Sequence, residues 1–213
     1  MKKIRKNLLL SLLLLISFAL WTTLICFVDV QPIGPEETSV GFATLNQFIH
    51  NLTGVNMLLY DITDLLSIIP LLIIFSFALL GAYQLFTRKS LKKVDYDILI
   101  LGGFYIIVMI FYVFFEFIII NYRPVLINGK LEASYPSSTT ILVMCVIPTA
   151  IMQFKSRIKG KLPRICITTL HYAFMLFMVL FRLISGVHWF TDIIGGILLS
   201  SGLVILYSSL TSD

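Results

Sequence analysis

Six long apolar segments, separated by shorter polar stretches, dominate the pattern of the chain. They run approximately over residues 8–28, 65–86, 98–120, 138–154, 165–181 and 190–210. A hydrocarbon core about 30 Å thick is crossed by about 20 apolar residues in a helix. In lipid, every backbone polar group has to be satisfied within the segment, which favours helices. The pattern therefore predicts an all-α polytopic membrane protein with six transmembrane helices, forming a single membrane domain over residues 1–213.

Several segments depart from a plain spanning helix. The first follows a basic N-terminus, as in a signal peptide, but its apolar run is longer and no Ala-x-Ala site follows, so we expect an uncleaved span. Pro70 and Pro148 lie inside two segments, where proline kinks a helix. Between the first two spans, apolar residues recur at helical spacing: Phe42, Leu45, Phe48, Ile49 and Leu52. They predict a short amphipathic helix, lying either in the membrane interface or packed as an ordinary loop helix.

Composition supports membrane insertion. The chain is 58% hydrophobic and 13% charged, whereas soluble domains carry about a quarter charged residues. A net charge of +5 would suggest nucleic acid as the partner of a soluble protein. Here the basic residues form short clusters between apolar runs, which is typical of membrane topology determinants. We therefore expect the bilayer as a partner and no nucleic acid.

The distribution of Lys and Arg predicts the orientation. The N-terminus, the loop between spans two and three, and the loop between spans four and five hold 13 of the 16 basic residues. Cytoplasmic loops are enriched in Lys and Arg. We therefore expect both termini in the cytoplasm. The opposite, extracytoplasmic side receives Arg123, Lys130 and Arg182.

Four ionisable residues lie at predicted helix ends on this sparse side. Arg123 closes the third span, Arg182 closes the fifth, and His188 and Asp192 open the sixth. Such residues usually face a protein interior or a wet cavity and have a function. Each also has a plainer explanation, because an Arg at a helix end can extend to the headgroups and a lone His can be a packing residue. Their common side favours a functional site.

The spacing of His188 and Asp192 indicates the chemistry. At positions i and i+4 of a helix their side chains are neighbours, and a carboxylate orients an imidazole and stabilises its positive charge. Two guanidinium groups hold a phosphate by paired hydrogen bonds. The set predicts phosphoryl transfer through a phosphohistidine. No carboxylate cluster of the kind that holds Mg²⁺ is present on this side, so we expect no metal and no cofactor.

These residues resemble the phosphatidic acid phosphatase type 2 superfamily of integral-membrane lipid phosphate phosphatases. Its signature is Lys-x6-Arg-Pro, then Pro-Ser-Gly-His, then Ser-Arg-x5-His-x3-Asp. The third motif matches at Arg182, His188 and Asp192 without its leading Ser. The first matches at Arg123 but has Glu116 in place of Lys. The second begins as Pro136 and Ser137 and continues with Ser138 and Thr139 in place of Gly-His.

The resemblance implies a role for each matching residue. His188 would be the nucleophile, Asp192 would orient it, and Arg123, Arg182, Ser137 and Ser138 would bind phosphate. Thr139 cannot replace the family's general acid, because its hydroxyl is too weakly acidic. On a helix, Glu116 would share a face with Arg123, about 10 Å away along the axis, where its carboxylate would repel an anionic substrate.

Two functions follow from this match. The first is a membrane lipid phosphatase that prefers lipid pyrophosphates, because a phosphate leaving group needs less help from a general acid than an alkoxide does. The second is a catalytically impaired member of the family that binds a phosphorylated lipid or a partner protein. A transporter is a third class, but paired, interrupted helices with charges at the membrane midplane are not evident in the sequence.

Overall fold

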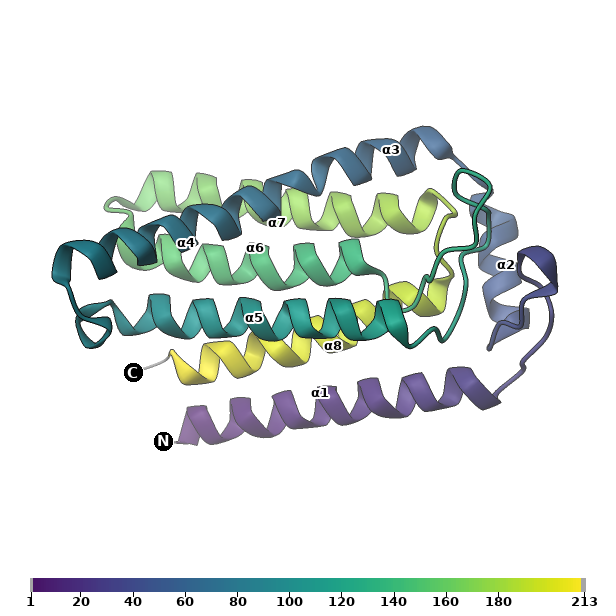
Figure 1. Ribbon diagram of the computed structural model, residues 1–213, viewed down its shortest axis with the longest axis horizontal. Helices are drawn as coiled ribbons and strands as arrows, with labels where there is room; N and C mark the ends of the chain where they lie inside the picture. Colours follow the sequence, from purple (N-terminus) through teal and green to yellow (C-terminus); the bar gives the residue numbers. More distant parts are fainter. Residues whose placement is uncertain (1, 212–213) are drawn as a thin grey trace.

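The computed structural model describes residues 2–211 and is a bundle of nearly parallel and antiparallel helices (Figure 1). Within that range, six helical stretches are long and apolar enough to cross a membrane, which confirms the predicted all-α, six-span fold. The helices are α1 (Lys2–Phe27), α2 (Ala43–Thr53), α3 (Met57–Leu66), α4 (Ile68–Arg88), α5 (Tyr96–Phe117), α6 (Ser138–Arg157), α7 (Lys161–Ile184) and α8 (Phe190–Leu210), with 3-10 turns η1 (Pro35–Glu37) and η2 (Leu91–Lys93).

The second span is longer than its apolar segment predicts. It comprises α3 and α4, which together run over Met57–Arg88 and are separated by a break at Ser67. Pro70 lies three residues beyond the break and has no N–H to offer the carbonyl of Leu66. The predicted kink is therefore present at this proline. At Pro148, by contrast, α6 continues without interruption.

The core lies around α6, which packs against α4, α5, α7 and α8. Because α6 faces protein rather than lipid, it can carry polar side chains that an outer helix cannot. Thr149 and Gln153 are both buried. The Thr149 hydroxyl lies 3.2 Å from that of Tyr105, and the Gln153 amide donates to the Tyr207 hydroxyl at 2.6 Å. This explains why the fourth span has the weakest apolar signal in the sequence.

The first helix is a full member of the bundle. It packs along α8, where the Ser11 hydroxyl donates to the carbonyl of Gly202 at 2.8 Å. Near its other end, the Trp21 indole donates to the carbonyl of Thr191 at 3.2 Å. These bonds link α1 to the helix that follows His188.

The predicted amphipathic helix is present as α2, and its apolar side faces outward. Leu45, Phe48 and Leu52 are exposed. The polar Asn46 is buried, donates to Thr191 Oγ1 at 3.0 Å, and accepts from the Thr191 N–H at 3.1 Å. A loop helix packed by its apolar face would show the reverse arrangement. The exposed apolar side therefore favours the interfacial interpretation.

The two ends of the bundle differ in content. Both chain termini, η2 and the connection between α6 and α7 lie at one end (Figure 1). At the other end lie α2, the segment between α5 and α6, and the turn between α7 and α8 (Figure 1). The basic loops therefore share the end of the termini, and the predicted site residues lie at the opposite end.

Candidate active site

The turn between α7 and α8 carries His188. Gly186 takes a φ of 67° there, and a Cβ on it would lie 1.8 Å from the carbonyl oxygen of Gly54. The Asn56 N–H donates to the carbonyl of Ser185 at 2.9 Å, which fastens the turn to the start of α3. The prediction that His188 lies on the sixth helix is wrong, because α8 begins at Phe190. His188 instead belongs to a turn held between two elements.

Hydrogen bonds define the tautomer of His188. Its Nε2 lies 3.2 Å from Nη1 of Arg123, and its Nδ1 lies 3.1 Å from the carbonyl oxygen of Ser134. A guanidinium only donates and a carbonyl only accepts. Nε2 is therefore the unprotonated nitrogen, and the proton resides on Nδ1. This is the form in which Nε2 can act as a nucleophile.

Asp192 lies beside His188 and also caps α8. Its Oδ2 is 3.5 Å from Nδ1 of His188 and accepts from the Trp189 N–H at 2.9 Å. Its Oδ1 accepts from the Asn121 amide at 3.5 Å. The predicted neighbourhood of the two residues is thus present, although a helix N-terminus and not a continuous helix produces it. A carboxylate is favoured at that position by the helix dipole.

The surroundings of His188 keep it neutral. The side chain is only 3% exposed. Burial lowers its pKa well below the ordinary value, and the positive charges of Arg123 and Arg182 lower this pKa further. A neutral imidazole with an unprotonated Nε2 is therefore the resting form.

Arg123 lies on an extended hairpin and not at a helix end, so that prediction is wrong. Helix α5 ends at Phe117, and isolated bridges pair Tyr122 with Ala133 and Ile127 with Lys130. Within this hairpin the Arg123 N–H donates to the carbonyl of Glu132 at 3.0 Å. The Glu132 carboxylate also forms an ion pair with Nε of Arg123 at 3.1 Å.

Arg182 lies in the last turn of α7, as predicted, and is 1% exposed. Its Nη1 donates to the Thr63 hydroxyl at 3.2 Å, and its Nη2 lies 3.9 Å from the Asp64 carboxylate. Its Nε has no hydrogen-bond partner among the described residues. A buried, unpaired donor is costly in a folded protein, and it points to an acceptor that a ligand would supply.

The start of α6 holds the residues of the second motif. The Ser137 hydroxyl caps the helix, with the Thr140 N–H 3.4 Å away, and is fully buried. Ser138 lines a cavity beside His188, and Thr139 does not. The first N–H groups of a helix have no partner within it and readily bind anions. The predicted phosphate-binding role therefore fits Ser138 and the helix terminus better than the Ser137 hydroxyl.

The cavity beside His188 is about 20 Å³ in volume. Its polar lining comes from Glu116, Ser134, Ser138, His188 and the hydroxyl-bearing rings of Tyr112 and Tyr135. Glu116 therefore lies at the site even though Arg123 is not on its helix. The predicted spacing of these two residues along one helix is wrong, but the expected carboxylate at the site is present.

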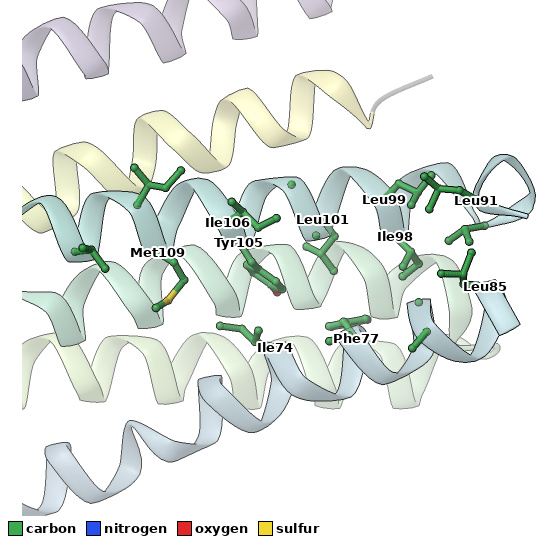
Figure 2. A pocket seen from close by; sticks show the side chains of 18 of the residues that line it. Ile74, Phe77, Leu85, Leu91, Ile98, Leu99, Leu101, Tyr105, Ile106 and Met109 are labelled. Carbon is green, nitrogen blue, oxygen red and sulfur yellow. The ribbon is translucent and has the colours of Figure 1, made fainter.

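A far larger groove lies between α4 and α5, with a volume of about 960 Å³ (Figure 2). Apolar side chains such as Phe77, Leu101 and Met109 line it, and none of the predicted site residues does. Tyr105 also lines it. Because the groove faces outward from spanning helices, its apolar lining suits contact with lipid chains.

Comparisons with known proteins place the fold. No protein-family model matches the sequence, and no curated protein matches it. Among solved structures, the chain is similar to the transmembrane PAP2-type phosphatidylglycerolphosphate phosphatase of Bacillus subtilis, with 16% identity, 93% of each chain covered and a TM-score of 0.58. The chain shares this PAP2-type fold.

Several polar residues near His188 and the two arginines were not identified by the sequence analysis. Asn121 is 2% exposed and bonds Asp192, the Ser134 carbonyl accepts from His188, and Tyr60 and Thr63 contact the arginines. Asn121 lies two residues before Arg123, so the first motif could have drawn attention to it. Nothing in the local pattern marks Tyr60 or Thr63, because their role depends on α3 packing against α7.

Among residues 2–211, no three His, Cys, Asp or Glu side chains lie close enough together to hold a metal ion. The positive charge near His188 comes instead from Arg123 and Arg182.

Proposed function

We propose that the protein is a membrane lipid phosphatase in which His188 attacks the phosphorus atom of a lipid phosphate. The observation that carries this proposal is the 3.2 Å contact between Arg123 Nη1 and His188 Nε2. It identifies Nε2 as the unprotonated nitrogen and puts a cation where phosphate charge would need to be neutralised. The fold shared with a PAP2-type phosphatase supports the same chemistry.

The reaction would proceed in two steps. In the first, the Nε2 lone pair forms a bond to phosphorus, the bond from phosphorus to the lipid oxygen breaks, and that oxygen keeps the electron pair. The imidazolium formed is stabilised by the Asp192 carboxylate, 3.5 Å from Nδ1. In the second, the oxygen of a water molecule attacks the phosphorus and gives up a proton to solvent, the phosphorus–nitrogen bond breaks, and Nε2 recovers its lone pair as phosphate leaves; the lipid oxygen released in the first step takes a proton from solvent. Arg123 and Arg182 neutralise the phosphate oxygens in both steps.

Substrate binding requires Arg123 to move away from Nε2. The adjoining cavity of about 20 Å³ has room for about one water molecule, which is less than a phosphoryl group needs. Phosphate oxygens would replace both Nε2 and the Glu132 carboxylate as the partners of Arg123. The described arrangement is therefore a closed form of the site.

A preference for lipid pyrophosphates follows from the leaving group. General acid catalysis contributes roughly 10²–10⁴-fold to such reactions, and Thr139 cannot supply the proton. A phosphate leaving group tolerates this loss better than an alkoxide. Glu116 opposes the preference, because its carboxylate lines the cavity and repels the additional negative charge of a pyrophosphate.

We place the site on the extracytoplasmic face and both termini in the cytoplasm. The support is that the clusters of Lys and Arg and both termini share one end of the bundle, with the site residues at the other (Figure 1). The substrate would then be a phosphorylated lipid of the outer leaflet.

The test is phosphate release from a panel of lipid monophosphates and pyrophosphates by the purified protein and by His188→Ala. We expect turnover by the wild type only, with faster turnover of pyrophosphates, and an acid-labile phosphohistidine in the wild type after a short reaction. Addition of a chelator should not reduce the rate, because the arginines supply the positive charge. Equal activity of the two proteins on every substrate would remove the proposal.

The alternative is a catalytically impaired protein that binds a phosphorylated lipid or a partner protein. It is favoured by the closed site, in which Arg123 covers Nε2, and by the absence of a general acid at Thr139. Saturable binding of a lipid phosphate without turnover, unchanged in His188→Ala, would support this function.

A further inference from the structure

Two guanidinium groups lie over a single aromatic ring at the site. The central guanidinium carbon of Arg182 lies 4.7 Å from the centre of the Tyr60 ring, and that of Arg123 lies 5.8 Å from it. Both distances are within the range of about 6 Å for cation–π attraction. Tyr60 belongs to α3, whereas the arginines come from the hairpin after α5 and from the end of α7. One ring therefore joins three separate elements.

The two arginines need such support because they carry like charges in a buried place. Arg182 is 1% exposed and Arg123 is 8% exposed, so little solvent screens their repulsion. Among the described residues, each forms an ion pair with one carboxylate, Glu132 for Arg123 and Asp64 for Arg182. The negative face of an aromatic ring attracts a cation without competing with phosphate for the guanidinium N–H groups.

The neighbouring residue on α3 completes the arrangement. Thr63 follows Tyr60 by three positions, so both lie on the same side of the helix. Its hydroxyl donates to the carbonyls of Leu59 and Tyr60 and accepts from Nη1 of Arg182 at 3.2 Å. Arg182 is thus fixed at one nitrogen by α3, and its unpaired Nε remains available to a ligand.

We propose that Tyr60 is a positioning residue that holds Arg123 and Arg182 together as one clamp for the phosphate group. The inference rests on the proposed phosphatase function and assigns to α3 a part in phosphate binding. Tyr60 acts through the two arginines and takes no part in bond making or breaking. Its loss would let the guanidinium groups separate. Part of the binding free energy of phosphate would then be used to bring them together again.

The experiment measures binding of inorganic phosphate to the purified full-length protein by calorimetry, together with kcat and KM for a lipid phosphate. Tyr60 is replaced by Phe, by Leu and by phenylalanines carrying one, two and three ring fluorines. Fluorine withdraws electron density from the ring face and weakens cation–π attraction while the ring shape is kept. Tyr83→Leu, an exposed tyrosine on α4, is the matched control.

We expect Tyr83→Leu to bind phosphate as the wild type does, and Tyr60→Phe to bind more tightly than Tyr60→Leu, because it keeps the ring and loses only the hydroxyl. Tyr60→Leu should bind on the order of tenfold more weakly, with a raised KM and a smaller change in kcat. The fluorinated series should weaken binding step by step, and it decides the matter even if the Leu variant fails to fold. Unchanged binding across the series, or no phosphate binding by the wild type, would overturn the inference.

His188→Ala separates this inference from the proposed function. If that variant turns over lipid phosphate like the wild type, the nucleophile is wrongly assigned, and the Tyr60 series still decides whether the clamp exists. If His188→Ala is inactive but the series has no effect, the phosphatase function stands and the clamp does not.

Discussion

Glu116 is the residue of the site least suited to an anionic substrate, because its carboxylate is negatively charged. Its side chain lines the same cavity as His188. The phosphatidic acid phosphatase type 2 signature, which the sequence resembles, has a lysine at this position. We predict that Glu116→Lys raises kcat/KM for a lipid pyrophosphate by about fivefold, because a repulsive charge beside the cavity becomes attractive, while the exposure of this side chain to solvent limits the gain. The measurement is the initial rate of phosphate release at substrate concentrations below KM.

The matched control is Glu37→Lys, which makes the same change of charge at an exposed residue of η1. That variant should leave kcat/KM within about twofold of the wild type, because Glu37 does not line the cavity beside His188 and solvent screens its charge. Equal gains in both variants would show that the overall charge of this end matters and that Glu116 has no special place in the site.

The neutral state of His188 makes a prediction about pH. Attack requires an unprotonated Nε2, and the pKa of His188 lies well below its ordinary value of 6.5 because of burial and the two arginines. Lowering the pH therefore protonates His188 only after the pH has passed below 6.5. We expect kcat/KM to fall on the acid side with a midpoint below 6.5. The measurement uses a lipid phosphate that carries no titratable group apart from the phosphate itself. A midpoint at or above 6.5 would contradict the buried, cation-flanked environment.

The sequence predicted the residues of the site better than it predicted their surroundings. His188, Asp192 and Arg182 were identified because they lie on the side of the membrane with few basic residues and, for His188 and Asp192, from their i and i+4 spacing. The structure brings His188 and Asp192 together. The positions of Arg123 and the role of Tyr60 could not be predicted in this way. The position of Arg123 depends on the pairing of Tyr122 with Ala133 in a hairpin, and the role of Tyr60 depends on the packing of α3 against α7, and an apolar pattern contains neither.

At the scale of elements, the turn between α7 and α8 is the most constrained segment near the site. Gly186 has a φ of 67°, and a side chain there would meet the carbonyl of Gly54 at 1.8 Å. We predict that Gly186→Ala destabilises the protein by at least about 1 kcal/mol, because the left-handed conformation disfavours a Cβ and the turn has to move. Activity should fall more steeply than stability, since the same turn carries His188. Thermal unfolding in detergent and phosphate release measure the two effects.

Gly102→Ala is the control for this substitution. A Cβ on Gly102 meets nothing within 4 Å, and the residue lies inside α5, where alanine is a better helix former than glycine by about 1 kcal/mol. We expect equal or higher thermal stability and unchanged activity. A loss of activity in Gly102→Ala as large as that in Gly186→Ala would show that the turn is not the sensitive element.

Helix ends illustrate what apolar patterns can and cannot show. The run of isoleucines at 118–120 extends the apolar segment, so the sequence predicted a helix to Ile120, but α5 ends at Phe117. β-branched residues lower helix propensity and suit extended backbone, and Pro124 disfavours α-helical backbone at Arg123. Burial in lipid and helical conformation are separate properties, and here they end at different residues.

For the whole molecule, six apolar segments and the asymmetric basic loops were enough to predict the number of spans, because both are imposed by the bilayer. In the structure, the site and the basic loops occupy opposite ends of the bundle (Figure 1). The side of the membrane that the site faces decides which leaflet supplies the substrate.

We predict that the hairpin after α5 is accessible from outside the cell and that η2 is not. Cys26 and Cys166 are exposed and would first be changed to Ser, while buried Cys145 is kept. Single cysteines are then introduced at Lys130 in the hairpin and at Lys92 in η2, both of which are exposed. A membrane-impermeant maleimide should label Lys130→Cys in intact cells and should label Lys92→Cys only after the cells are permeabilised, because the positive clusters stay on the cytoplasmic side. The reverse pattern would place the site in the cytoplasm, where its substrate would be a lipid of the inner leaflet.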